Sequence, residues 1–243
     1  IIFIAIAAGR LPKEEQAKAT NIGLILAMVM RIALLFGISW LVAMSEPWFS
    51  IDTSWAQGGF SGQSIILIVG GIFLLYKSTT EILHKLEGED EALEQSGKKK
   101  NTLSSAIVQI TLINIVFSFD SILTAVGMTS GVSGALIIMI VAVVLSILIM
   151  MLFGAPVGNF VNKHPSIQML GLSFLILIGF MLIAEGAHMS HFEVAGSKIG
   201  AIPKGYLYFA IFFSLGVEML NMKLRKGYKP VGLKQQIETQ TKS

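Results

Sequence analysis

The stretch Val132–Phe153 (VSGALIIMIVAVVLSILIMMLF) decides the fold class, because it contains no charged residue and serine is its only polar side chain. A bilayer core about 30 Å thick is crossed by roughly 20 helical residues. Val132–Phe153 is therefore predicted to span a membrane as one helix. Five other stretches have a similar length and an apolar composition: Asn21–Met44, Ser64–Leu83, Leu103–Met128, Ile167–Ala184 and Tyr206–Met222.

The composition of the whole chain supports a membrane protein. Of its 243 residues, 53% are hydrophobic and only 14% are charged, and the mean hydropathy is +0.73. Soluble domains carry about 25% charged residues, so a soluble domain and a disordered chain are both disfavoured. The absence of cysteine excludes disulfides, thiolate zinc sites and cysteine nucleophiles. A pI of 9.1 does not indicate nucleic acid as a partner, because the basic residues lie between the apolar stretches.

The order of the apolar stretches predicts an all-α bundle of seven transmembrane helices. We interpret Ile1–Gly9 as the end of a truncated first helix. Three helices would precede the polar segment Glu87–Asn101 and three would follow it, which indicates an inverted 3+3 repeat plus one last helix. The predicted transmembrane domain is 1–225, with a first half 1–86, a cytoplasmic loop 87–101, a second half 102–184, a last helix 204–223 and a cytoplasmic tail 226–243. The loop is either a solvated linker or a regulatory site.

Basic residues are distributed unequally between the two predicted sides of the membrane. All of the 18 Lys and Arg residues except Arg31, Lys198 and Lys204 belong to one side. The positive-inside rule places this side in the cytoplasm, together with the C-terminus. The connections are also expected to hold the helix-breaking prolines, which are Pro12, Pro47, Pro156, Pro165 and Pro203.

The stretch Ser64–Leu83 is strongly apolar only to Tyr76, and Lys77 is expected to snorkel toward the headgroups. Three charged residues lie inside the strongly apolar parts of the predicted spans: Arg31, Asp120 and Glu218. A charge within a membrane costs several kcal/mol unless it is paired or hydrated, so each is a candidate functional residue. Two acids against one base favour a cation as ligand. Arg31 either pairs with a membrane carboxylate or competes with a metal for it. Glu218 is a second ion site, a partner of Arg31 or a residue that snorkels to the surface.

The helix around Asp120 is unusually rich in oxygen-bearing side chains. At about 100° per residue, one stripe of this helix carries Thr111, Asn114, Ser118 and Ser121, and a neighbouring stripe carries Gln109, Asp120 and Thr124. Hard divalent cations such as Mn²⁺ and Mg²⁺ prefer carboxylate, amide and hydroxyl oxygens. We therefore predict a metal site from Asp120, Asn114, Ser118, Ser121 and Thr124, completed by a facing helix. The alternative for the hydroxyl and amide groups is helix–helix packing.

A second group of metal-ligating residues follows the stretch Ile167–Ala184. In Glu185–Glu193 (EGAHMSHFE), Glu185, His188 and His191 are spaced by three residues, so one helical face could hold all three side chains. This spacing predicts an outer metal or exit site at Glu185 and His188. The alternative is a solvated loop without fixed ligands.

The stretch Asn114–Met128 (NIVFSFDSILTAVGM) resembles the TerC family of integral membrane proteins. Four other stretches are similar to the same family: Ile1–Pro12, Gly70–Gly88, His164–Glu185 and Pro203–Asn221. Ala27–Leu34 (AMVMRIAL) carries the membrane arginine of that family at Arg31. The resemblance extends over about residues 1–225.

This resemblance implies a multi-pass bacterial inner-membrane protein with a role in Mn²⁺ efflux. In the family, acidic residues of the first and fourth helices form the expected metal site. Asp120 matches the fourth-helix position, while the first-helix acid would lie before Ile1. Relatives often carry Asp where this chain has Asn114, so the site has one negative charge fewer, and a weaker divalent affinity or a different preferred ion is expected.

The leading functional hypothesis is a secondary transporter that exports divalent metal ions, with Mn²⁺ as its transported ligand and no fixed cofactor. The alternative is a metal-sensing or scaffold component of a membrane stress complex for tellurite resistance, without transport of its own. The lipid bilayer is the expected environment, and a second copy or secretion machinery is the expected partner. No enzyme activity is expected, because no nucleophile–base pair is recognisable.

Overall fold

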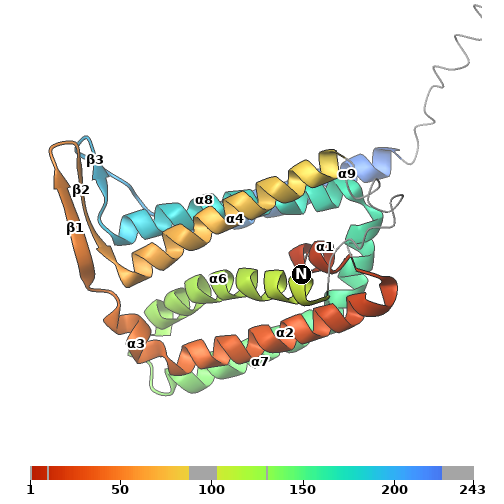
Figure 1. Ribbon diagram of the computed structural model, residues 1–243, viewed down its shortest axis with the longest axis horizontal. Helices are drawn as coiled ribbons and strands as arrows, with labels where there is room; N and C mark the ends of the chain where they lie inside the picture. The colour runs from red at the N-terminus through yellow and green to blue at the C-terminus, as the bar shows by residue number, and fades with distance from the viewer. Residues whose placement is uncertain (1, 10, 88–102, 130, 226–243) are drawn as a thin grey trace, which may run out of the picture.

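The computed structural model describes residues 2–9, 11–87, 103–129 and 131–225. Long helices lie side by side, and a small sheet caps one end of them (Figure 1). The helices are α1 (Ile2–Gly9), α2 (Lys13–Phe36), α3 (Ile38–Ala43), α4 (Gly62–Leu86), α6 (Leu103–Thr129), α7 (Ala135–Lys163), α8 (Pro165–Met189) and α9 (Lys204–Arg225). Six of them are long and apolar enough to cross a membrane: α2, α4, α6, α7, α8 and α9.

Helix α2 differs from the predicted stretch Asn21–Met44 at both ends. It begins eight residues earlier, at Lys13 directly after Pro12, and Glu14 and Glu15 lie in its first turn. Acidic side chains stabilise a helix N-terminus, so the polar sequence before Asn21 continues the helix beyond the apolar stretch. At the other end the helix stops at Phe36, and after Gly37 the chain forms the separate short helix α3.

Helix α7 is longer than the predicted stretch Val132–Phe153, and the placement of Pro156 in a connection was wrong. The helix continues through Pro156 and ends at Lys163. A proline cannot donate the backbone hydrogen bond to the residue four positions earlier, which is Leu152. Transmembrane helices tolerate this loss where neighbouring groups or local adjustment compensate for it.

Helices α4 and α8 form the most closely packed pair. A Cβ atom added to Gly71 would lie 2.6 Å from the carbonyl oxygen of Gly179, and one added to Gly179 would lie 2.9 Å from that of Gly71. The two backbones therefore approach as closely as glycine permits. Gly186, near the end of α8, makes a similar contact with α4. A Cβ atom added to it would lie 2.7 Å from the carbonyl oxygen of Ser64.

The other helices group around α1 and α6. Helix α2 packs along α6, and α7 packs along α1. Side chains from all these elements share one hydrophobic core, including the buried Ile4, Leu24, Ile110 and Val161. Helix α9 contacts mainly α8, and none of the residues in its apolar window is buried.

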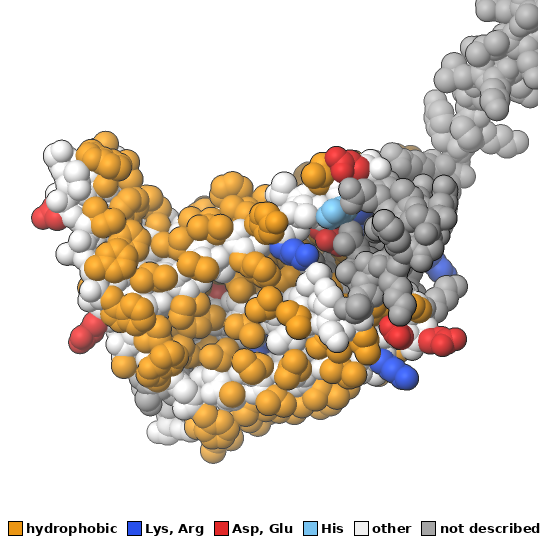
Figure 2. All heavy atoms as spheres, viewed as in Figure 1, with side chains coloured by type: hydrophobic (Ala, Val, Ile, Leu, Met, Phe, Trp, Pro, Cys, Tyr) orange, Lys and Arg blue, Asp and Glu red, His pale blue; other side chains and the backbone are white. Residues whose placement is uncertain are grey.

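The segments between helices at one end form a four-stranded sheet that the all-α prediction did not include. Its strands are β1 (Pro47–Thr53), β2 (Ala56–Ser61), β3 (Glu193–Val194) and β4 (Ser197–Lys198), antiparallel and in that order. Phe60 of β2 packs against Phe192, with ring centroids 5.7 Å apart. The sheet thus ties the connection before α4 to the connection after α8. Hydrophobic side chains cover most of the molecular face seen in Figure 2, as a lipid-facing surface requires.

Candidate functional site

Asp120 forms an ion pair inside the bundle, with a partner that the sequence analysis did not identify. The ammonium group of Lys204 lies 2.9 Å from both carboxylate oxygens of Asp120. Asp120 lies on α6 about 14 Å from the end of that helix, at 1.5 Å per residue. Lys204 is the first residue of α9. The two side chains are 25% and 29% exposed, so the pair is largely withdrawn from the surface.

Thr124 completes the surroundings of this ammonium group. Lys204 donates a hydrogen bond of 2.6 Å to the hydroxyl oxygen of Thr124, which itself donates to the backbone carbonyl of Asp120. Thr124 follows Asp120 by one helical turn, so both present oxygen atoms on one face of α6. Three side-chain oxygens therefore converge on one positive charge.

The sequence analysis placed Lys204 at the outer start of the predicted last helix 204–223 and gave it no role. The signal that could have found it is its position directly after Pro203, at the start of an apolar stretch. The predicted topology brings the start of that stretch and the outer half of the Asp120 helix to the same side of the membrane. A lysine stem is long enough to carry its charge along a helix toward a carboxylate.

Arg31 contacts the other polar stripe of α6. Its Nε group donates a hydrogen bond of 2.7 Å to the hydroxyl of Ser118. Ser118 donates in turn to the backbone carbonyl of Asn114, whose side-chain amide donates to the carbonyl of Ile110. Both polar residues are buried, with 1% and 8% exposure. In the described part of the chain, no carboxylate lies within ion-pair distance of Arg31.

The five predicted metal ligands are therefore divided between two neighbours. Asn114 and Ser118 support Arg31 of α2, whereas Asp120 and Thr124 hold Lys204 of α9. Ser121 is exposed and donates to the carbonyl of Ser118. Ser118 of the first stripe thus contacts α2, whereas Asp120 and Thr124 of the second stripe contact Lys204 of α9. Asp120 and Thr124 remain together, and their side-chain oxygens accept hydrogen bonds from a single cation, the ammonium group of Lys204.

The remaining candidate residues lie apart from this pair. Glu218 is half-buried on α9, and Glu185 is half-buried on α8. His188 is exposed in the last turn of α8, with its Nδ1 atom 3.3 Å from the carbonyl oxygen of Ile199. Across residues 2–9, 11–87, 103–129 and 131–225, no three His, Asp or Glu side chains are grouped so that they could hold a metal ion.

One buried acid was not among the predicted charges. Glu81 of α4 is only 2% exposed. Glu81 lies near the end of the predicted span Ser64–Leu83 but beyond its strongly apolar part, and the structure extends that helix to Leu86.

Comparisons with known proteins identify relatives that cover almost the whole chain. The integral membrane protein TerC family matches residues 1–231. The inner membrane protein YgdQ of Escherichia coli K12, described as UPF0053, is 43% identical over 222 residues, which are 91% of this chain and 84% of YgdQ. A UPF0053 protein of Haemophilus influenzae is 38% identical over 226 residues, 93% of this chain and 87% of its own length.

A longer relative matches the chain over part of its length. The UPF0053 inner membrane protein YoaE of Escherichia coli K12 is 41% identical over 230 residues, which are 94% of this chain but 40% of YoaE. The unit described above is therefore also present within larger proteins. No solved structure matches the chain.

Proposed function

The chain belongs to the TerC family of integral membrane proteins, and from this premise we propose that it is a secondary transporter that exports divalent metal ions, with Mn²⁺ as the expected substrate. One observation carries the proposal. Two carboxylate oxygens of Asp120 and the hydroxyl of Thr124 surround a positive charge within a membrane helix bundle. In this proposal the ammonium group of Lys204 holds the place that a transported cation takes in another state.

The chemistry of the three oxygens suits a hard divalent cation. Mn²⁺ prefers carboxylate, hydroxyl, carbonyl and water oxygens, so Asp120, Thr124 and water would share its coordination. Asp120 could exchange the metal for the ammonium group of Lys204 without being left unpaired in the membrane. Helix α9, which carries Lys204, lies at the edge of the bundle and contacts mainly α8, so withdrawal of the lysine would disturb few other contacts.

The packing of the helices supports an inverted repeat with α1 as the seventh helix. In such a repeat α1 would correspond to α6, α2 to α7 and α4 to α8. The contact of α2 with α6 would then be repeated as the contact of α7 with α1, and both contacts are present. The same symmetry would exchange α4 and α8 with each other, so their close contact would lie beside the two-fold axis. Transporters with this architecture expose a central site alternately to the two sides of the membrane.

The chain is a multi-pass inner-membrane protein, as its relatives YgdQ and YoaE are named. We place the sheet outside the cytoplasm and the C-terminus inside, because the opposite helix ends carry most of the lysines and arginines. The predicted loop 87–101 and tail 226–243 lie outside the described residues, except for Glu87. In this orientation Asp120 and Thr124 lie in the outer half of the membrane.

Metal flux through the purified full-length protein tests the proposal. Proteoliposomes with an enclosed metal-sensitive dye would be given Mn²⁺, Ca²⁺, Mg²⁺ or Zn²⁺, with and without a proton gradient. We expect saturable Mn²⁺ flux that Asp120→Asn abolishes. The matched control is Asp52→Asn, which makes the same chemical change in the exposed strand β1 and is expected to keep full flux.

Two results would contradict transport at Asp120. Undiminished flux in a folded Asp120→Asn protein would remove this residue from the site. Absence of flux for every ion, with a folded protein, would favour the alternative of a metal-sensing or scaffold protein.

A further inference from the structure

A cavity of about 390 Å³ lies between α1, α2 and α7, in the half of the bundle away from the sheet. The buried Ile4, Ala5 and Ala8 of α1 form its floor. Helices α2 and α7 form its two walls, and both walls include exposed residues, among them Asn21 and Asn159. The cavity therefore opens sideways between two helices that contact the membrane.

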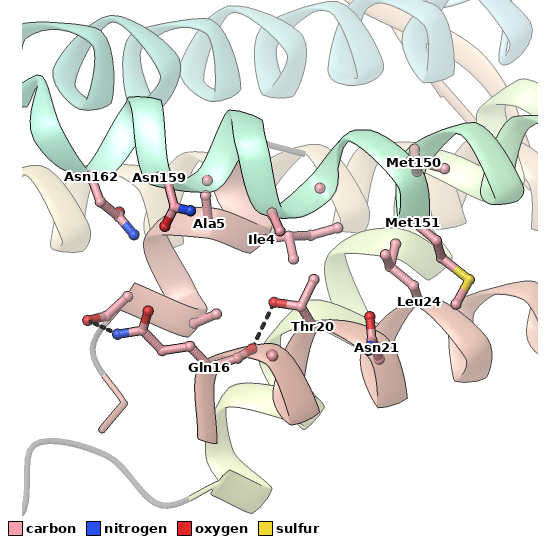
Figure 3. Close-up of a pocket in the computed structure, with 16 residues that line it drawn as sticks. Ile4, Ala5, Gln16, Thr20, Asn21, Leu24, Met150, Met151, Asn159 and Asn162 are labelled. Atoms are coloured by element: carbon pink, nitrogen blue, oxygen red, sulfur yellow. Dashed lines mark hydrogen bonds between the residues drawn. The ribbon is translucent and has the colours of Figure 1, made fainter. Parts of the chain in front are cut away.

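The lining of the cavity changes from polar to apolar along the helices. At the end away from the sheet it carries the polar side chains Gln16, Thr20, Asn21, Asn159 and Asn162. Toward the middle of the bundle these give way to Leu24, Met150 and Met151. Figure 3 shows the two asparagines of α7 pointing toward α2, with the methionines at the other end.

Several polar atoms in the cavity are available to a ligand. Gln16 donates to the carbonyls of Leu11 at 2.9 Å and Gly9 at 3.4 Å, and Thr20 donates to the carbonyl of Gln16 at 2.9 Å, so both side chains retain oxygen lone pairs. Figure 3 marks the Gln16–Gly9 and Thr20–Gln16 bonds. The Asn21 and Asn159 side chains make no hydrogen bond within the described part of the chain. Their amides can both donate and accept.

The charges around the cavity disfavour a metal ion as its occupant. No carboxylate lines it, and a divalent cation is rarely held by neutral ligands alone. Two exposed lysines lie near the polar end on the same two helices, and Glu14 and Glu15 lie in the first turn of α2. Lys18 precedes Asn21 by one helical turn on α2, and Lys163 follows Asn159 by one turn on α7.

We propose that this cavity binds a phospholipid from the leaflet at the lysine-rich end of the bundle. The amides of Asn21 and Asn159 would hydrogen-bond the glycerol esters, and Lys18 and Lys163 would attract the phosphate. The beginning of an acyl chain would lie against Met150 and Met151. From the membrane surface inward, a phospholipid has a charged phosphate, then polar esters, then apolar chains, which is the order lysine, asparagine and methionine in the cavity. Basic sites between helices favour anionic headgroups.

This inference rests on the membrane placement given above, but it does not require metal transport. A photoactivatable phosphatidylglycerol in phosphatidylcholine vesicles tests it without any metal present. We expect cross-links concentrated on the cavity residues of α2 and α7. Ala155→Trp, which fills the mouth of the cavity, should reduce them several-fold, and so should the double substitution Asn159→Leu/Asn162→Leu.

The matched control is Leu152→Trp on the same helix, where the side chain is 71% exposed and does not line the cavity. It should leave the cross-links unchanged. The thermal unfolding of each variant in detergent checks that it is folded. Cross-links spread evenly around the bundle, or unaffected by both cavity variants, would overturn the proposal. A slower Mn²⁺ flux with unchanged cross-links would also overturn it and favour an ion vestibule.

Discussion

Lys204 changes the interpretation of Asp120. The sequence identified Asp120, Thr124, Ser118 and Arg31 as polar groups in the membrane, because their cost there is apparent from hydropathy alone. It could not predict which helix each group faces, since that depends on the packing of α2 on α6 and on the reach of Lys204 from the start of α9 to α6. The structure separates them into an Asp120–Lys204 pair and an Arg31–Ser118 hydrogen bond.

Removal of the lysine tests whether its ammonium group occupies a cation site. In Lys204→Met, Asp120 loses its partner, and we expect the protein without metal to lose about 1.5–3 kcal/mol of stability, the range for hydrogen bonds to charged groups. Added Mn²⁺ should restore the thermal unfolding temperature of this variant more than that of the parent protein. Lys198→Met, at an 81% exposed lysine of β4, is the control, and the same metal response in both variants would refute the competition.

The hydrogen bond from Arg31 to Ser118 is expected to stabilise the packing of α2 on α6. Ser118→Ala leaves a half-buried guanidinium group without this acceptor, which should cost about 1–2 kcal/mol. Ser173→Ala is the control, because Ser173 is exposed and its hydroxyl bonds only to its own helix. Reversible unfolding in mixed micelles measures both, and equal stability of the two variants would show that the Arg31 contact contributes nothing.

At the scale of the elements, hydropathy predicted the helices better than their ends. The stretch Leu103–Met128 agrees with α6 within one residue, because polar segments flank it on both sides. Helices α2 and α7 extend well beyond their apolar stretches, through polar sequence and through Pro156. The sheet was not predicted: the hairpin of β1 and β2 lies in a short connection between two apolar stretches, and the pairing of β2 with β3 joins residues far apart in the chain.

The close approach of α4 and α8 gives a prediction at this scale. Gly71→Ala would place a methyl group 2.6 Å from a backbone oxygen of α8, so the helices must separate, at a cost of about 1–3 kcal/mol. Gly127→Ala in α6 is the matched control, because nothing lies within 4 Å of its added methyl group. Thermal unfolding of the two variants distinguishes them. Unchanged stability of Gly71→Ala would contradict the close packing.

In the part of the chain that the structure describes, the sheet lies at one end of the molecule and most of the lysines and arginines lie toward the other. The direction of this arrangement in the membrane was predicted from charge alone, whereas the pairing of the helices required the structure. The family relationship adds that nearly all of this unit is shared with YgdQ and with part of YoaE. The three oxygens around Lys204 and the lipid cavity lie in opposite halves of this arrangement, so they can be tested separately.

Single cysteines test the orientation, because the chain has no cysteine of its own. Ser50→Cys in β1 should react with a membrane-impermeant maleimide applied to intact spheroplasts. Lys18→Cys in the first part of α2 should react only after the membrane is opened. The reverse pattern would place the sheet in the cytoplasm and contradict the orientation.

The most direct test of the central claim is the binding of Mn²⁺ to the purified full-length protein, followed by electron paramagnetic resonance. Free Mn²⁺ gives a sharp signal that decreases when the ion is bound. The account predicts saturable binding by the parent protein and by Asp52→Asn, and no such binding by a folded Asp120→Asn protein. Equal binding in Asp120→Asn and the parent protein would contradict the assignment of Asp120 as a metal ligand.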